Sequence, residues 1–432
     1  MAGWAQWIRG GLDALQSKHL LRTLRPIVPI GGAHSSPVKV MLSASTLESW
    51  LGDANGAEAA AHRRAAVLAC DRAPRGEALH GVTLFSTNDY LGLSSHPRVR
   101  RAMSKACEDW GGGPRSSALV AGHTAEQRDL ASALAKLKSK EACVLFPSGF
   151  AANVAAAACL AASPDVEVFS DELNHASIID GLRMAMRGDG AKKRLSVYRH
   201  CDMAHLESLL SASTAPRRLV ITDSLFSMDG DVAPLAALAA LRRRYGFLLL
   251  VDDAHASLVF GSTGGGVAEA AGVEGEVDVV VGTLSKAVGQ LGGFVCGSKD
   301  LCDYLTNTAR SMIYSTALPA PIVSGALAAL EVNASEPLLR DAVWDRVRQL
   351  ESLTGVQATS PIIPFIIGSS EAAMDASRLL LRRGLHVPAI RPPTVKEGSA
   401  RLRVALSAAH SKEDVALLAA ALFDTGALRN VK

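Results

Sequence analysis

The chain lacks long apolar stretches and any marked excess of one charge. No uninterrupted apolar run in its 432 residues approaches the roughly 18–20 residues that a membrane-spanning helix needs. Its 45 basic and 42 acidic residues give a formal charge of +3, with no basic stripe and no acidic tail. The sequence therefore predicts neither a membrane partner nor a nucleic-acid partner.

The chain also lacks the paired cysteine spacing that is typical of disulfide frameworks and zinc sites. Seven cysteines are scattered without a C-x-x-C pair, and most of them lie in apolar segments. An odd, dispersed set of this kind indicates reduced thiols in an intracellular protein. The positions are Cys70, Cys107, Cys143, Cys159, Cys201, Cys296 and Cys302.

What the chain does have is a set of short apolar runs that end in polar residues. Residues 247–251 run into Asp252, and residues 279–281 run into a short segment that ends at Lys286. Such runs are typical of buried parallel strands, and ligands bind outside the carboxyl ends of these strands. A lysine there can form a Schiff base with an aldehyde cofactor, while a carboxylate holds the cofactor's pyridine nitrogen. Asp252 and Lys286 therefore predict a pyridoxal phosphate (PLP) enzyme.

Apolar runs alternate with helical patterns through the middle of the chain, which predicts an α/β fold. The expected strands lie near 142–146, 166–169, 195–198, 219–222, 247–251, 278–281 and 293–296. This alternation favours one mainly parallel seven-stranded sheet with helices on both faces. We expect an N-terminal helical segment over 1–83, a large cofactor-binding domain over 84–318 and a small C-terminal α+β domain over 319–432.

The two ends of the chain carry weaker patterns. Residues 1–27 have apolar side chains at helical spacing, which favours an amphipathic helix over a mitochondrial presequence. Residues 28–45 are expected to form a loop and 46–80 a helical segment. Near the other end we expect a long helix over 320–353, then strands at 362–367, 385–390 and 402–406 and a helix over 371–383. Ser411 and Asp414 predict the capped start of the last helix.

Further polar residues follow successive predicted strands. Gly149 lies in a small-residue turn that opens a helix, which suits a phosphate, and His175 can stack on a flat cofactor. Ser227 and His255 come after two later strands. Each of them, taken alone, is equally compatible with an ordinary turn, a helix cap or a loop histidine. Their succession in register with Asp252 and Lys286 is what favours a shared site.

Two clusters are alternatives that would hold a metal ion. The first consists of Asp252, Asp253 and His255, and it would suit a metal hydrolase, although no further ligand-spaced cluster completes it. The second comprises His200, Cys201, Asp202 and His205, which we interpret as structural. We therefore predict no metal.

These motifs resemble the α-oxoamine synthases of the PLP fold-type I group, and the resemblance runs over about residues 20–423. Ile390–Val395, followed by Arg401–Arg403, is most similar to the branch that joins pimeloyl-CoA to L-alanine in biotin synthesis. Several stretches look most like its plant forms. The matching segments are Asn88–Leu93, Ser148–Asn153, Asn174–Ser177, Phe226–Asp231, Asp252–His255, Thr283–Lys286, Tyr314–Thr316 and Arg391–Val395.

The resemblance implies a role for each matching residue. Lys286 would be the Schiff-base lysine, Asp252 the partner of the pyridine nitrogen and His255 that of the phenolic oxygen, with His175 stacked on the ring. Arg403 would take the amino acid's carboxylate, which suits a guanidinium fork. The other positions implied to touch cofactor are Gly149, Phe150, Ser227, Thr283, Ser315 and Thr316, and those implied to touch substrate are Arg22, Asn88 and Thr394.

The resemblance further implies a homodimer in which Ser315 and Thr316 reach the neighbour's phosphate. Sister synthases that use glycine or serine, and a non-catalytic partner subunit, are the alternatives, although the presence of Lys286 argues against the silent subunit. We expect a cytoplasmic protein, with peroxisomal and mitochondrial alternatives, because the last three residues, 430–432, are not of the Ser-Lys-Leu type.

The chain departs from the family pattern at three places on the substrate side. Ala256-Ser257-Leu258 stands where Gly-Thr-Gly is usual, which could alter the turn. Lys396 replaces a proline, and Ser116-Ser117-Ala118 replaces Gly-Ser-Arg. None of these removes a catalytic group, so the departures bear on the choice of acyl chain.

Overall fold

The computed structural model describes residues 2–17, 27–29, 36–51, 79–186 and 194–427, which form two compact units. The first unit comprises Met1–Ile30 and Val40–Val82, and the second comprises Gly31–Lys39 and Thr83–Lys432. No helix among these described residues combines the length and apolarity that spanning a membrane requires.

The first unit holds the predicted N-terminal helix and a strand that the sequence prediction missed. Helix α1 (Ala2–Ser17) confirms the helical spacing, and α2 (Ala44–Leu51) falls at the start of the helical segment expected over 46–80, of which residues 52–78 lie outside the described part of the chain. The loop expected over 28–45 is wrong, because β1 (Val28–Pro29) pairs antiparallel with β2 (Lys39–Ser43). Burial alternates along β2, where Val40 and Leu42 are buried. This alternation is short and lies among turn-forming residues, which hid it.

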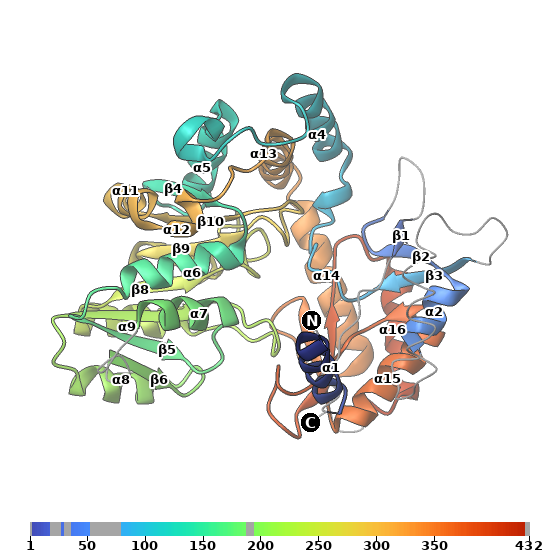
Figure 1. Cartoon of the computed structure of the whole chain (residues 1–432). Helices are drawn as coiled ribbons and strands as arrows, with labels where there is room; N and C mark the ends of the chain where they lie inside the picture. The colour runs from blue at the N-terminus through green and yellow to red at the C-terminus, as the bar shows by residue number, and fades with distance from the viewer. Residues whose placement is uncertain (1, 18–26, 30–35, 52–78, 187–193, 428–432) are drawn as a thin grey trace. The chain divides into compact units, whose positions relative to one another are not determined.

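The second unit is built around the predicted seven-stranded sheet, whose order is β4-β10-β9-β8-β7-β5-β6 (Figure 1). Only β10 runs antiparallel to its neighbours, so the carboxyl ends of the other strands meet at one edge. The fold class is therefore confirmed. The strands are β4 (Ala142–Phe146), β5 (Val166–Asp171), β6 (Leu195–Tyr198), β7 (Arg217–Asp223), β8 (Leu248–Asp252), β9 (Val279–Thr283) and β10 (Gly293–Gly297).

Consecutive residues of the central strands enter two different cores, which explains why these strands are uninterrupted apolar runs. Val279 and Val281 belong to one core, whereas Val280, between them, belongs to the other. Leu250 likewise belongs to one core, whereas its neighbours Leu249 and Val251 belong to the other. A strand buried on both faces has no solvent side, so polar alternation disappears.

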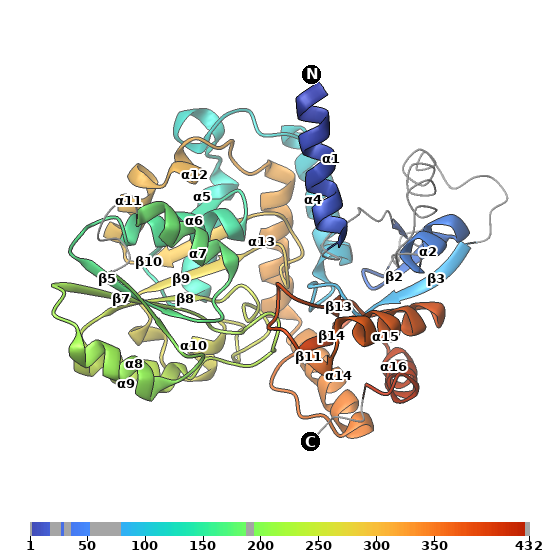
Figure 2. The same ribbon diagram turned by 60° about the horizontal axis from the view of Figure 1, so that its bottom comes forward.

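Helices cover both faces of this sheet, as predicted. Helices α6 (Gly149–Leu160) and α7 (Ala176–Ala185) lie on one face, while α8 (Met203–Ala212) and α9 (Leu235–Tyr245) lie on the other (Figure 2). The remaining helices of this region are α4 (Pro97–Trp110), α5 (Ala125–Leu137), α10 (Val267–Ala270), α11 (Lys299–Thr308) and α12 (Arg310–Ile313).

The C-terminal part forms a small α+β domain with its own core. Its three-stranded sheet has the order β11-β14-β13, and the capping box at Ser411 is present. Helix α13 (Ala320–Ser335) packs in a core of the large sheet. The elements that follow it are α14 (Leu338–Thr354), β11 (Ile362–Gly368), α15 (Ser370–Arg382), β12 (Leu385–His386), β13 (Ala389–Ile390), β14 (Ala400–Ala405) and α16 (Lys412–Asp424). The boundary between residues 318 and 319 stays a prediction.

Two predicted elements of this part are each divided. The helix expected over 320–353 breaks before Pro337, because proline disfavours helical geometry in the residue that precedes it. The strand expected over 385–390 is interrupted at Val387-Pro388. Its first half, β12, pairs with Thr83 and Leu84 at the end of β3 (Leu79–Leu84), whereas β13 pairs with β14.

Candidate active site

A cavity of about 230 Å³ opens at the carboxyl edge of the large sheet, and seven of the predicted residues line it. They come from the last residues of β8 and β9 and from the segments that follow β4, β5, β8 and β9, as expected for a site at the carboxyl ends of strands. The seven are Gly149, Phe150, His175, Asp252, His255, Thr283 and Lys286.

Asp252 ends strand β8 and is held at both carboxylate oxygens. Asn153 donates from Nδ2 to Oδ2 at 2.5 Å, and the Ala254 N–H donates to Oδ1 at 2.9 Å. Asp223 stands directly opposite on β7, and its burial and the nearby Asp252 carboxylate raise its pKa well above the ordinary value. Asp252 is thus a fixed carboxylate at the cavity wall, able to accept a hydrogen bond from a protonated ring nitrogen.

Lys286 brings a buried amine to the same cavity. Burial lowers its pKa to about 8, although the Asp252 and Asp223 carboxylates oppose the shift. A lysine with such a pKa is partly neutral near neutral pH, which is the form that attacks an aldehyde or takes up a proton.

The end of the cavity at helix α6 fits a phosphate group. Ser148 caps the helix by accepting from the Ala151 N–H, and Gly149, the first residue of the helix, lies against Thr283. The other N–H groups of a first helical turn have no partner within the helix. A Cβ on Gly149 would lie 2.8 Å from the Thr283 Cβ, so only glycine allows this approach. The hydroxyls of Thr283 and Ser285 lie 2.8 Å apart next to this turn. Helix N–H groups and hydroxyls are the donors that a phosphate needs.

His255 is held as a neutral ring at the cavity wall. Burial, followed by the charges of Lys286 and Arg403, lowers its pKa well below the usual value. The Tyr90 hydroxyl contacts His255 Nδ1 at 2.7 Å. Burial raises the pKa of Tyr90 to about 12, against the opposing effect of Arg403. A neutral His255 that accepts at Nδ1 presents Nε2–H as a donor.

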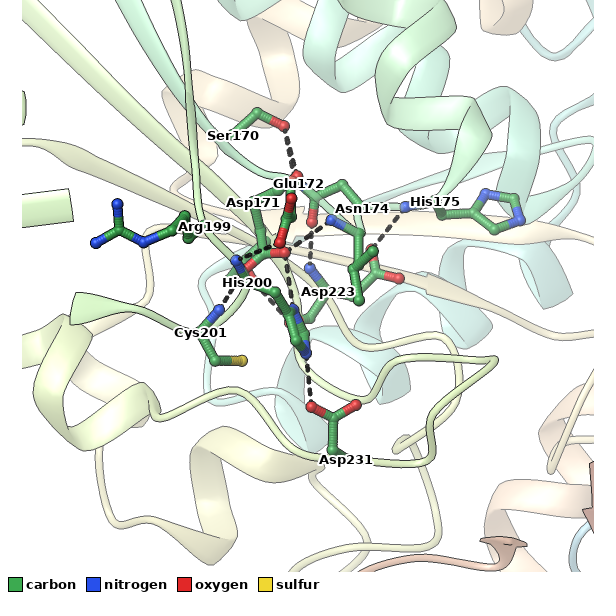
Figure 3. Close-up of polar contacts among 12 residues, drawn as sticks. Ser170, Asp171, Glu172, Asn174, His175, Arg199, His200, Cys201, Asp223 and Asp231 are labelled. Carbon is green, nitrogen blue, oxygen red and sulfur yellow. Dashed lines mark hydrogen bonds and ion pairs between the residues drawn. The ribbon is translucent and has the colours of Figure 1, made fainter. Parts of the chain in front are cut away.

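His175 caps helix α7 and is oriented from both sides. Its Nδ1 accepts from the Ser177 N–H at 3.2 Å and lies 2.7 Å from the Ser177 hydroxyl. Its backbone N–H donates to Asp223 Oδ1 at 3.4 Å, as Figure 3 shows. Burial lowers the pKa of the ring, and Asp252 opposes this effect. The imidazole is therefore a neutral, oriented plane, which suits stacking on a flat cofactor.

A buried ion pair braces the turn that carries Asp252 and His255. Lys138 Nζ donates to Asp253 Oδ2 at 2.7 Å, to Ser257 Oγ at 2.8 Å and to the Gly265 carbonyl at 2.8 Å. The exposed fraction of the two charged side chains is 1% for Lys138 and 4% for Asp253. Asp253 is thus committed to structure, so the metal-hydrolase alternative loses one of its three ligands.

The other predicted site residues lie outside this cavity. The Ser227 carbonyl accepts from Arg403 Nε, and Arg403 Nη2 approaches Asn88 Oδ1 at 3.5 Å. Thr394 is an exposed turn residue. Ser315 and Thr316 line a different cavity of about 400 Å³. Arg22 lies outside the described residues.

Two of the departures from the family pattern have structural consequences. Leu258 adopts a φ of 64°, in the left-handed region that glycine occupies at little cost, and its side chain is fully buried. Lys396 pairs with Glu172 at 3.6 Å, which connects the 391–399 segment to the turn before His175.

Sequence reasoning missed four residues that shape the site, namely Tyr90, Lys138, Asn153 and Asp223. Tyr90 and Asn153 lie within matched motifs, which was an available signal. Nothing along the sequence indicates that Lys138 contacts Asp253, since this pairing depends on the folded arrangement.

Comparisons with known proteins agree with this geometry. Residues 80–422 match the family model described as aminotransferase class I and II. The chain belongs to this family. A curated relative from Arabidopsis thaliana, called 8-amino-7-oxononanoate synthase, is 46% identical over 97% of this chain and 94% of its own length. The predicted resemblance is therefore confirmed.

Two solved structures have a fold similar to that of this chain. A serine palmitoyltransferase from S. paucimobilis with bound PLP and myriocin has a TM-score of 0.80 and 25% identity, covering 97% of this chain and 96% of that one. An 8-amino-7-oxononanoate synthase from Francisella tularensis has a TM-score of 0.67 and 26% identity, covering 80% and 96%.

Proposed function

We propose that this chain is a PLP-dependent 8-amino-7-oxononanoate synthase. It condenses pimeloyl-CoA, or a pimeloyl thioester on another carrier, with L-alanine to give 8-amino-7-oxononanoate, CoA and CO₂ in biotin biosynthesis. The observation that carries the proposal is the meeting of Lys286, Asp252, His255 and His175 in one cavity beside the start of α6. The names of the full-length relatives support the substrate assignment.

Each residue has a role that follows from its surroundings. PLP, when bound, supplies an aldehyde that captures the amino acid and a ring that withdraws electrons from its Cα. Lys286 Nζ would hold the cofactor at rest, then take the proton from Cα and later return one. Asp252 would keep the ring nitrogen protonated, while His255 Nε2–H would donate to the ring's phenolic oxygen. His175 would stack on the ring.

The substrate-binding roles rest on the residues around Arg403. Its guanidinium would take the α-carboxylate of L-alanine, with Asn88 beside it. Arg22 and Thr394 remain candidates for contact with substrate. Phe150, Thr283 and Gly149 would surround the phosphate of the cofactor. Ser227, whose carbonyl accepts from Arg403, would also contact the cofactor.

The proposal extends to a homodimer. Ser315 and Thr316 do not line the cavity of their own chain's Lys286, which supports a role at the phosphate of a second copy. Sedimentation of the holoenzyme tests the assembly. We also propose a cytoplasmic location, which imaging of the protein tagged at either end checks against peroxisomal and mitochondrial ones.

The test of the function is a substrate comparison with purified holoenzyme. We expect release of CoA and CO₂ from L-alanine with pimeloyl-CoA, and far less from glycine with acetyl-CoA or from L-serine with palmitoyl-CoA. Lys286→Ala should lower turnover by more than about 1000-fold, whereas Lys299→Ala, at an exposed pair with Asp303, should not. Turnover with glycine and acetyl-CoA alone would assign a sister synthase instead.

A further inference from the structure

A histidine outside the cavity joins two of the loops that build the site. His200 follows β6, and its ring lies between Asp171, the last residue of β5, and Asp231 (Figure 3). The Nδ1 atom is 2.9 Å from Asp171 Oδ1, and Nε2 is 2.6 Å from Asp231 Oδ2. The edge of the ring meets Phe226, with centroids 4.4 Å apart. We call His200, Asp171 and Asp231 the His200 bridge.

The chemistry of the bridge requires a charged ring. Both partners are carboxylates, which accept hydrogen bonds, so both ring nitrogens must donate, and only the imidazolium form carries two N–H groups. Burial lowers the pKa of His200, but the hydrogen bonds to Asp171 and Asp231 outweigh it and raise the pKa to about 12. The side chain is 20% exposed, so solvent screens the pairs only in part.

One end of the bridge supports the turn that carries His175. Asp171 also accepts from the Leu173 N–H at 2.9 Å and from the Cys201 N–H at 2.9 Å. Asn174, in the same turn, donates to the Ile221 carbonyl at 2.9 Å. These contacts fix the backbone that leads through His175 into α7, whose first residue is Ala176.

The other end supports the loop that positions Arg403. The Asp231 carbonyl accepts from the Phe226 N–H at 3.0 Å, which closes the loop 226–231. The Ser227 carbonyl in this loop accepts from Arg403 Nε. The loop therefore supplies one of the acceptors that orient the guanidinium, alongside Asn88.

We propose that His200 is a positioning residue, which as an imidazolium between Asp171 and Asp231 fixes the His175 turn relative to the Arg403 loop. It thereby aligns the cofactor ring with the receptor for the amino acid's carboxylate. This proposal rests on the proposed function and deepens it, because it names a residue that sets the affinity for the amino acid without touching substrate or cofactor.

A metal ion is the competing reading of this cluster. Asp171, His200 and Cys201 each offer one ligand atom, and these atoms lie within 4.8 Å of one another. However, the ring nitrogens lie 2.9 Å and 2.6 Å from carboxylate oxygens, which is the distance of a direct hydrogen bond and leaves no room for an ion between the two atoms. The geometry therefore favours hydrogen bonds, and not a metal ion, between His200 and the two carboxylates.

The test compares His200→Gln with a control at a nearby histidine, His205, which lies in the first turn of α8. His205→Gln is the control, since His205 Nδ1 accepts only from the Arg199 N–H and has no contact with the 226–231 loop. For His200→Gln we expect the KM and the dissociation constant for L-alanine to rise about tenfold, with kcat within about threefold. Cofactor content should stay that of the wild type, because Lys286 and Asp252 are unchanged. His205→Gln should match the wild type throughout.

A second variant keeps the test independent of folding defects. Asp231→Asn retains an oxygen that accepts from Nε2–H, so it should weaken L-alanine binding by less than about threefold. Unchanged L-alanine binding in His200→Gln, or parallel loss of cofactor and amino-acid binding, would overturn the proposal. Stoichiometric zinc in the purified wild type, lost in His200→Gln, would also overturn it.

The same measurements separate this proposal from the proposed function. A wild-type enzyme that binds glycine or L-serine but not L-alanine contradicts the substrate assignment, and the bridge is then tested with the amino acid that does bind. Arg403 recognises an α-carboxylate in all three cases, so the expected weakening in His200→Gln is the same.

Discussion

Two charged networks brace the candidate site, and they differ in burial and in what they hold. The Lys138–Asp253 pair is almost completely buried and supports the turn of Asp252 and His255. The His200 bridge is partly exposed and joins two loops, those of His175 and Ser227. A buried pair that loses one partner leaves an uncompensated charge in the core, whereas a half-exposed bridge can be replaced by water. We therefore expect the first to govern stability and the second to govern substrate capture.

The largest expected effect is that of Lys138→Met. The substitution leaves Asp253 buried without its cation, so the free energy of unfolding should fall by about 3–5 kcal/mol in chemical denaturation. Lys299→Met, which removes a solvent-exposed pair, is the matched control and should leave the free energy of unfolding unchanged within the error of the measurement. Equal effects of the two variants would contradict the contrast between the networks.

A second effect concerns the left-handed residue in the same braced turn. Leu258→Ala should destabilise by about 2–4 kcal/mol, because it empties a core position while keeping a Cβ at a φ of 64°. Leu258→Gly loses the same side chain but relieves the backbone, so it should be more stable than Leu258→Ala by about 1 kcal/mol. The reverse order in thermal denaturation would show that the turn is not strained.

A smaller expected effect is the pH dependence of the stability that the His200 bridge contributes. The folded-state pKa of His200 is raised far above its unfolded value of about 6.5, so its stabilisation is complete below that pH and declines as the pH rises. We expect His200→Gln to lower the free energy of unfolding by about 1.5 kcal/mol near pH 6 and by less near pH 9. A gap that widens as the pH rises would contradict a charged bridge.

Much of the fold and the cavity could be predicted because they follow from strand ends. Val279, Val280 and Val281 form one apolar run in the sequence because they enter opposite cores. The end of that run predicted Lys286 at the carboxyl edge of the sheet, and the structure has it lining the cavity there. The pairing of Asn153 with Asp252 could not be predicted, because it depends on how α6 lies against the sheet. Strand β2 was missed because its alternation is too short to stand out.

Covalent trapping shows whether the cavity holds PLP on Lys286. Borohydride reduction of the yellow holoenzyme, followed by proteolysis and mass spectrometry, should locate the cofactor on the peptide that contains Lys286. We predict one modified lysine per chain at that position. A colourless protein, or a cofactor fixed to any other lysine, would contradict the assignment of Lys286 as the Schiff-base lysine.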